Sequence, residues 1–237
     1  MNNKAFLDCL ADAFQTYLKT GARSNKKLVI LHSFIARALL AKLSEFGGGY
    51  NIKSLGVGDG KEADIFGRYL NKKVDLTIYK NDRVVAGVAV KFVMSNYSQN
   101  SNNYFENMLG ETANIRAARI PYYHILILTN GAPYFERDGK ISKTEKITAG
   151  NLHKYQVLAG DDPQQFMHTP DRTLLYLVKV KRDESLVMGN KAQFTESLTG
   201  ISQFETCTLD GVRFADGVIL NDFEKFIEKI AHHIASQ

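Results

Sequence analysis

Apolar residues recur at helical spacing in two segments before residue 50. In residues 3–18 most apolar positions lie three or four residues apart, as on one face of a helix: Phe6, Leu7, Leu10, Phe14 and Leu18. The second segment, Leu28–Phe46, is more strongly apolar and runs into Gly47-Gly48-Gly49, a glycine run that ends a helix. The pattern therefore predicts two N-terminal helices.

Three strand-like runs follow these helices. They are Ala63–Tyr69, Lys73–Tyr79 and Val84–Phe92. The last two are separated by a turn around Asn81 and Asp82, whose side chains tolerate turn dihedrals. The second and third runs are therefore expected to form a hairpin.

A polar tract, Ser95–Asn103, is interpreted as a connector before the next helix, Tyr104–Arg119. Pro121 then breaks the chain before a buried strand, Tyr123–Leu128. The order of helix, three strands, helix and strand occupies about residues 28–130. It predicts an α/β fold with a central mixed sheet of four to six strands, flanked by helices.

The second half gives a weaker pattern. A helix is expected over Asn151–Leu158, a strand over Leu174–Val180 and another strand within Phe214–Leu220. Asp222 is expected to cap a final amphipathic helix. The 237 residues show no repeat and no disordered linker, so we expect a single domain.

Composition narrows the classes of partner. No apolar stretch approaches the roughly 20 residues of a membrane span, and the N-terminus lacks a secretory signal. Cys9 and Cys207 lie far apart and have no zinc spacing, so a cytoplasmic protein with reduced thiols is expected. A net charge of +5 and a pI of about 9.0 favour a polyanionic partner, although such values are common.

Two charged residues stand inside otherwise apolar strands. Asp75 lies in the second run and Lys91 in the third. A buried charge is unfavourable unless it is paired or bound to a metal, so the two are expected to compensate each other around a site. Carboxylates hold divalent cations, and a lysine can orient water or stabilise a phosphate. The alternative is a structural Asp–Lys pair, or a Lys91 whose ammonium simply reaches water.

The turn geometry decides whether these two side chains meet. With a plain two-residue turn, Asn81-Asp82, Asp75 would oppose Val88 and point away from Lys91. A three-residue turn or a β-bulge would place Asp75 opposite Ala89, on the same face as Lys91. We therefore predict the three-residue turn or the bulge.

A third acid is expected from the following helix. Glu106 is favoured because it shares a face with small apolar residues suited to packing on the sheet, and Glu111 is the alternative. Glu62, and less so Asp64, precede or begin the first strand and could assist with a second metal; each is also typical of a solvated turn.

Over residues 28–130 this pattern resembles the PD-(D/E)XK nucleases, in particular the type II restriction endonucleases. In that family a metal-binding Asp starts the second strand, and an acid-x-Lys triplet lies in the third. Asp75 and Lys91 match these positions, whereas Val74 replaces the family's proline and Ala89 replaces the acid of the triplet. Some restriction enzymes carry that acid on the following helix, close to the place of Glu106.

The resemblance implies a restriction-endonuclease-like core and an Mg²⁺-dependent homodimer that cuts double-stranded DNA at a specific site. Asp75, Glu106 and the backbone carbonyl of Val90 would lie at the metal, and Lys91 would position water or phosphate. Residues 131–237 would serve target recognition and dimerisation. Because Ala89 replaces the acid, the alternative is an inactive DNA-binding protein on a nuclease fold. An enzyme acting on small phosphorylated substrates is disfavoured because residues 56–60 lack the full phosphate-loop pattern.

Several polar and basic residues are candidates for contacts with DNA. Side chains of the polar tract suit phosphates and base edges, and two arginines at the end of the helix suit phosphates; the set is Asn96, Ser98, Gln99, Asn102, Asn103, Arg116 and Arg119. Tyr97 and Tyr104 could lie against sugars or bases. Basic clusters at residues 23–27, 140–146 and 179–182 would contact the DNA backbone, and the alternative for all these segments is an ordinary solvated surface.

Overall fold

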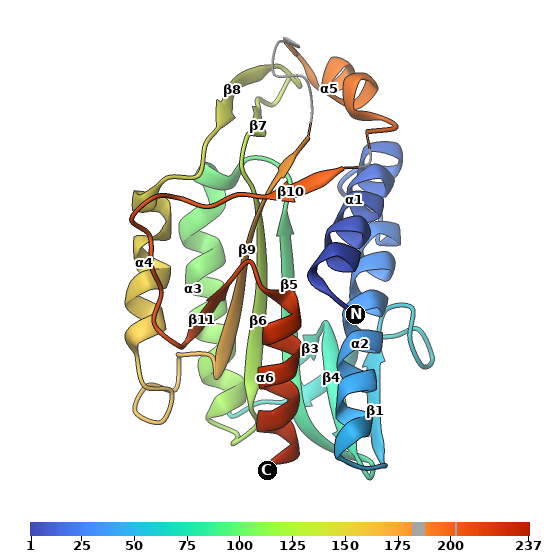
Figure 1. Cartoon of the computed structure of the whole chain (residues 1–237), viewed down its shortest axis with the longest axis vertical. Helices are drawn as coiled ribbons and strands as arrows, with labels where there is room; N and C mark the ends of the chain where they lie inside the picture. Colours follow the sequence, from blue (N-terminus) through green and yellow to red (C-terminus); the bar gives the residue numbers. More distant parts are fainter. Residues whose placement is uncertain (182–187, 202) are drawn as a thin grey trace.

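The computed structural model describes residues 1–181, 188–201 and 203–237. A central sheet carries helices on both faces (Figure 1). On one face pack α1 (Asn3–Thr20), α2 (Lys26–Leu43) and α6 (Phe223–Ala235), and on the other α3 (Tyr97–Arg116) and α4 (Ala149–Gly160). This arrangement confirms the predicted α/β fold.

Among the described residues, six strands of the main sheet follow the order β1-β4-β5-β6-β9-β10, and β11 also pairs with β9. Their bounds are β1 (Tyr50–Ser54), β4 (Leu76–Lys80), β5 (Arg83–Val93), β6 (Tyr122–Thr129), β9 (Arg172–Val180), β10 (Phe204–Thr206) and β11 (Val218–Leu220). β5, β6 and β9 run parallel, whereas β1, β4 and β5 alternate in direction. The sheet is therefore mixed, as predicted, and draws strands from both halves of the chain.

The centre of the sheet is covered on both faces. All eight residues of β6 are buried, as expected of a parallel strand between two layers of helices. Ile125 and Ile127 join the core beneath α1, α2 and α6, whereas Leu126 and Leu128 join the core beneath α3 and α4. The alternation of side chains along the strand thus divides the interior into two cores.

The shorter elements lie around this sheet. Two hairpins stand beside it: β2 (Ala63–Phe66) pairs with β3 (Asn71–Val74), and β7 (Ala132–Phe135) pairs with β8 (Ile141–Glu145). The remaining elements are the short helices η1 (Ser44–Phe46) and α5 (Lys191–Leu198). The sequence pattern did not predict β1, β7, β8, β10 or α5, all of which are short.

The helix after β5 begins earlier than predicted. α3 starts at Tyr97, so most of the polar tract is its first two turns and not a connector. The carboxylate of Glu145 accepts hydrogen bonds from the backbone N–H of Tyr97 (2.6 Å) and of Ser98 (3.1 Å), and it also contacts the Ser98 hydroxyl. A carboxylate at this position satisfies free amides and complements the helix dipole. The cap comes from a strand 48 residues away, so it has no local sequence signal.

The C-terminal helix agrees with its prediction. Asp222 caps α6 by accepting a hydrogen bond from the Lys225 amide at 3.1 Å, and Asn3 donates to the same carboxylate at 3.0 Å. The two ends of the chain are thereby joined. Within the described residues, none of the helices has the length and apolar character that a bilayer crossing would need.

Candidate functional site

The candidate site begins where β4 leaves β5. β4 pairs with β5 only as far as Leu76 opposite Val88, whereas β6 pairs with the other edge of β5 as far as Val93. Among the strands of the described residues, none pairs with the β4 edge of β5 beyond Val88. There the carboxylate of Asp75 accepts a hydrogen bond from the backbone N–H of Val90 at 2.7 Å.

Asp75 lies at a break between two strands. The predicted run Lys73–Tyr79 is in fact two strands, with β3 pairing to β2 and β4 pairing to β5. Asp75 occupies the junction, and its backbone carbonyl accepts a hydrogen bond from the Ser54 hydroxyl at 2.7 Å. The Asp75 carboxylate accepts the hydrogen bond from β5 that a backbone carbonyl would accept in a continuous strand. The chain can therefore pass from one sheet to the other at this residue.

The β4–β5 hairpin contains the predicted bulge. The turn has two residues, Asn81 and Asp82, with φ values of 48° and 65°. The register then shifts between Ile78 and Tyr79, leaving Val85 without a partner on β4. Continuing the later register puts Asp75 opposite Ala89, hence on the Lys91 side of β5. The prediction of a bulge is confirmed.

Burial makes Asp75 an unusual acid. Burial raises the pKa of its carboxyl to about 6, although the Val90 N–H works in the opposite direction. The charge of Glu111 raises this pKa further, while Lys72 and Lys91 lower it. Asp75 therefore lies close to both negative and positive side chains, as expected at a functional site.

Lys91 reaches the same space from β5. Its side chain is exposed, and its ammonium lies 4.6 Å from the centre of the Tyr104 ring, a cation–π contact. In the described part of the chain Lys91 forms no ion pair. The geometry thus leaves its positive charge available to a ligand.

The two candidate acids on α3 differ in their surroundings. Glu111 forms an ion pair with Lys72 (3.0 Å) and accepts a hydrogen bond from the Tyr122 hydroxyl. Glu106 is exposed. Burial lowers the pKa of Lys154, and the charge of Glu106 partly opposes this shift. Of the two, Glu111 is the acid whose charge raises the pKa of Asp75.

A histidine that the sequence interpretation overlooked also lies here. One ligand atom from each of His32, Glu62 and Asp75 lies within 4.8 Å of the others. Burial lowers the pKa of His32 to about 4, although Glu62 opposes this shift. The pKa of Glu62 is raised by burial and by Asp75, while His32 and Lys73 lower it. In the sequence, His32 stands in a strongly apolar helix and looks like an ordinary core residue.

All of these candidate groups except Glu62 line one cavity of about 880 Å³. α2, the β3–β4 junction, β5 and α3 contribute to its wall, and its polar residues include His32, Lys72, Asp75, Lys91, Tyr104, Glu106, Glu111 and Asn114. Val90 also lines the cavity, where its amide is bonded to Asp75. The structure thus brings Asp75, Lys91, Glu106 and Glu111 together from three separate segments.

Comparisons with protein-family models, curated proteins and solved structures found no match.

The polar residues at the start of α3 are partly used inside the protein. The Asn96 amide bonds to the backbone of Phe135 in both directions, at 2.8 and 3.1 Å. Ser98 contacts Glu145, and Asn102 accepts a hydrogen bond from Lys154 at 3.1 Å. Ser98, Gln99, Asn102 and Asn103 are all exposed, and Gln99 accepts a longer hydrogen bond from the Asn96 amide at 3.5 Å. Of the predicted DNA contacts in this tract, Gln99 and Asn103 have the fewest contacts within the described residues.

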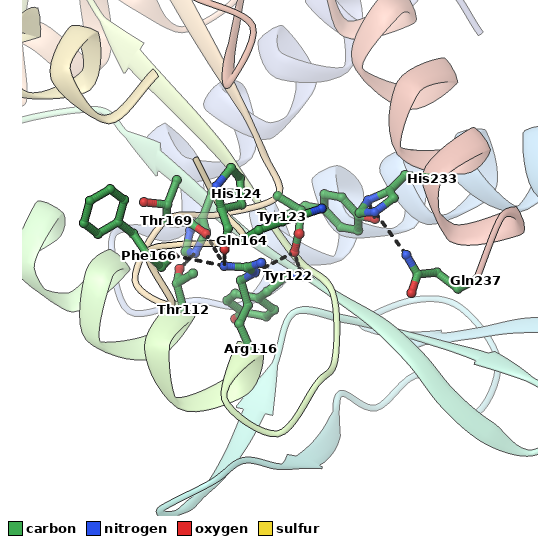
Figure 2. Close-up of polar contacts among 12 residues, drawn as sticks. Thr112, Arg116, Tyr122, Tyr123, His124, Gln164, Phe166, Thr169, His233 and Gln237 are labelled. Carbon is green, nitrogen blue, oxygen red and sulfur yellow. Dashed lines mark hydrogen bonds and ion pairs between the residues drawn. The ribbon is translucent and has the colours of Figure 1, made fainter. Parts of the chain in front are cut away.

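Arg116, predicted from the sequence as a phosphate contact, instead makes contacts within the protein. Its guanidinium forms an ion pair with Asp171 at 3.0 Å and donates to the backbone carbonyls of Pro163, Phe166 and Thr169. Figure 2 shows these contacts converging on its end of α3. Arg116 thus fixes the loop before β9, whereas Arg119 is exposed.

The basic clusters also differ in availability. The Lys27 ammonium donates to three backbone carbonyls of the loop before α2, so it caps that loop. Lys140 and Lys143 are exposed or partly exposed in the β7–β8 hairpin. Arg182, in the third cluster, lies outside the described residues.

Proposed function

We propose that the chain is a metal-dependent endonuclease of the PD-(D/E)XK type, a type II restriction enzyme that hydrolyses double-stranded DNA at a specific site. One observation carries the proposal: a bulged hairpin directs the carboxylate of Asp75 and the unpaired ammonium of Lys91 into one cavity. An acid on α3, Glu106 or Glu111, lines the same cavity. This is the set of groups that phosphodiester hydrolysis requires.

In this reaction a water oxygen bonds to phosphorus, the bond from phosphorus to one sugar oxygen breaks, and the leaving oxygen gains a proton. A divalent cation such as Mg²⁺, held by Asp75 and an acid of α3, would neutralise charge on the phosphate and lower the pKa of the water. The Val90 amide holds one oxygen of Asp75 and so orients the carboxylate. Lys91 is placed to donate to a phosphate oxygen as negative charge develops.

An exposed apolar tip beside the cavity supports DNA as the substrate. The β2–β3 hairpin exposes Phe66, Tyr69 and Leu70 to 72%, 80% and 59%. Arg68 and Lys73 on the same hairpin are also exposed. Aromatic side chains flanked by cations suit contact with bases and phosphates of a nucleic acid.

The wider assembly is part of the same proposal. A homodimer with twofold symmetry suits a palindromic DNA site, and such an enzyme would act on DNA in the cytoplasm. Gln99 and Asn103, exposed at the start of α3, would contact the duplex beside the cleft.

The test is cleavage of mixed plasmid and phage DNA by the purified protein with Mg²⁺, which should give discrete fragments. Asp75→Asn and Lys91→Ala should each lower the rate by at least about a hundredfold while preserving the fold. Lys80→Ala is the matched control because the Lys80 ammonium also lies over a tyrosine ring, at 5.0 Å from that of Tyr50, but does not line the cavity. Normal cutting by either cavity variant would refute the proposal.

Two further results refine the outcome. The larger loss of activity among Glu106→Gln and Glu111→Gln would identify the third acid. If the wild type binds duplex DNA with strong salt dependence but never cuts it, the replacement of the family's acid by Ala89 has removed catalysis. The chain would then be a DNA-binding protein on a nuclease fold.

A further inference from the structure

His32 is a buried polar residue whose hydrogen bonds are not accounted for. Its side chain, on α2, is fully buried, and neither ring nitrogen has a hydrogen-bond partner in the described residues. An unmet buried donor or acceptor destabilises a fold. A buried side chain without hydrogen bonds is commonly satisfied by a bound water or ion.

The ring faces two carboxylates. His32 Nδ1 lies 3.8 Å from Glu62 Oε1, too far for a hydrogen bond, and Asp75 completes a group within 4.8 Å. Two ligand atoms that each lie about 2.1 Å from one ion are about 3–4 Å apart. The spacing is thus close to that of ligands around a shared cation.

We propose that His32, Glu62 and Asp75 form a binding site for one divalent transition-metal cation, of the Mn²⁺, Co²⁺ or Zn²⁺ class. One imidazole with two carboxylates suits these ions better than Mg²⁺, which takes oxygen ligands. Three protein ligands leave coordination positions open to water or substrate.

The site borders the cavity and spans separate parts of the fold. His32 and Asp75 both line the 880 Å³ cavity, and the Glu62 side chain is 20% exposed. The ligands come from α2, the segment before β2 and the β3–β4 junction. A bound ion would join these elements and stabilise the folded state.

This inference goes beyond the proposed nuclease function, because the metal is bound whether or not the cleft cuts DNA. The test titrates the full chain, freed of metal with a chelator, with Co²⁺, Mn²⁺, Zn²⁺ or Mg²⁺. Isothermal titration calorimetry measures the heat of binding, and the visible absorption spectrum reports the coordination of Co²⁺. We expect one Co²⁺ per chain, bound at least about tenfold more tightly than Mg²⁺. A folded wild type that shows no such preference would overturn the proposal.

Variants identify the ligands. His32→Gln should weaken Co²⁺ binding by at least about tenfold, as even changes around metal ligands do. His153→Gln, at an exposed histidine of α4, is the matched control and should bind like the wild type. Equal Co²⁺ affinity in His32→Gln and the wild type would refute the site.

A spectroscopic measurement on the wild type covers the case in which His32→Gln fails to fold. Pulsed electron paramagnetic resonance of bound Mn²⁺ should show coupling to an imidazole nitrogen, and its absence would refute the assignment. The two proposals fail separately. Co²⁺ binding through His32 without DNA cleavage would refute the nuclease alone, whereas Mg²⁺-dependent cleavage by a chain whose Co²⁺ binding does not involve His32 would refute this metal site alone.

Discussion

At the tip of the β2–β3 hairpin, the side chain of Asn114 on α3 forms three hydrogen bonds with the backbone. Its side-chain oxygen accepts hydrogen bonds from the backbone N–H of Tyr69 (2.9 Å) and Leu70 (3.2 Å), and its amide nitrogen donates to the Leu70 carbonyl at 2.9 Å. Gly67 packs so closely that a Cβ built there would lie 2.1 Å from the Asn114 nitrogen. Asn114→Ala removes these three side-chain hydrogen bonds, while the backbone carbonyl of residue 114 still accepts from the Arg68 N–H.

The expected loss follows from these contacts. Three hydrogen bonds at about 1 kcal/mol each give about 3 kcal/mol. Alanine regains about 0.5 kcal/mol because it favours the helix more than asparagine does. We therefore expect Asn114→Ala to lower the free energy of unfolding by about 2–3 kcal/mol, which is about 4–12 °C in Tm for a chain of this size.

Equilibrium unfolding in urea measures this loss. Asn103→Ala is the matched control, because Asn103 is an exposed asparagine of the same helix and reports helix propensity alone. Asn114→Asp keeps the acceptor for Tyr69 and Leu70 but loses the donor to the Leu70 carbonyl, so its stability should lie between the wild type and the alanine variant.

A double-mutant cycle tests the close packing. Gly67→Ala should destabilise the wild type, because the new methyl group meets the Asn114 side chain, but should be nearly neutral beside Asn114→Ala. The reasoning is refuted if Gly67→Ala has the same effect in both backgrounds. It is also refuted if Asn114→Ala lowers the free energy of unfolding no more than Asn103→Ala does.

Three further predictions concern stability. Arg116→Ala should lose about 3 kcal/mol in urea unfolding because it leaves the Asp171 carboxylate, whose side chain is only 11% exposed, without its cation; a loss no larger than that of exposed Arg119→Ala would contradict this. Glu145→Gln should lose about 1.5–3 kcal/mol by weakening the charged cap on the Tyr97 amide, and unchanged thermal unfolding would argue against the cap. Burial lowers the pKa of His124 to about 3, from 6.5, so the unfolded chain takes up this proton first as the pH falls. His124 alone should then lower the stability by about 1.4 kcal/mol per pH unit between about pH 6 and pH 3, and His124→Gln should remove this contribution from the difference between its unfolding curves and those of the wild type.

The sequence was sufficient to predict the relation between Asp75 and Lys91. Charged residues inside apolar strands stand out. Because side chains alternate between the two faces of a strand, the length of the turn and the presence of a bulge decide on which face each of the two residues lies. The bulge at Val85 was the arrangement that this logic required, and the structure contains it. Long helices and the buried strand β6 were predictable for the same reason, since their periodic patterns extend over many residues.

What the sequence could not supply were the long-range contacts. The polar tract became helical because Glu145 caps it from β8, and Arg116 turned inward because a loop 47–55 residues away offers its carbonyls and Asp171. From the neighbouring sequence alone, the polar tract is predicted to be a connector and Arg116 a surface residue. Their contacts with residues distant in sequence instead make the tract helical and turn Arg116 inward.

The break in the strand at Asp75 explains why the cavity exists at this place. An uninterrupted strand over residues 73–79 would continue to pair with β5 beyond Val88 and would close its edge. Instead, β3 turns away to pair with β2, and the Asp75 side chain takes the Val90 amide that a backbone carbonyl would otherwise accept. A single acid thus both ends the ladder and faces the space that this ending opens. For that reason we expect its neutral shape analogue, Asp75→Asn, to preserve the fold better than Asp75→Val, which would leave the Val90 N–H without its acceptor.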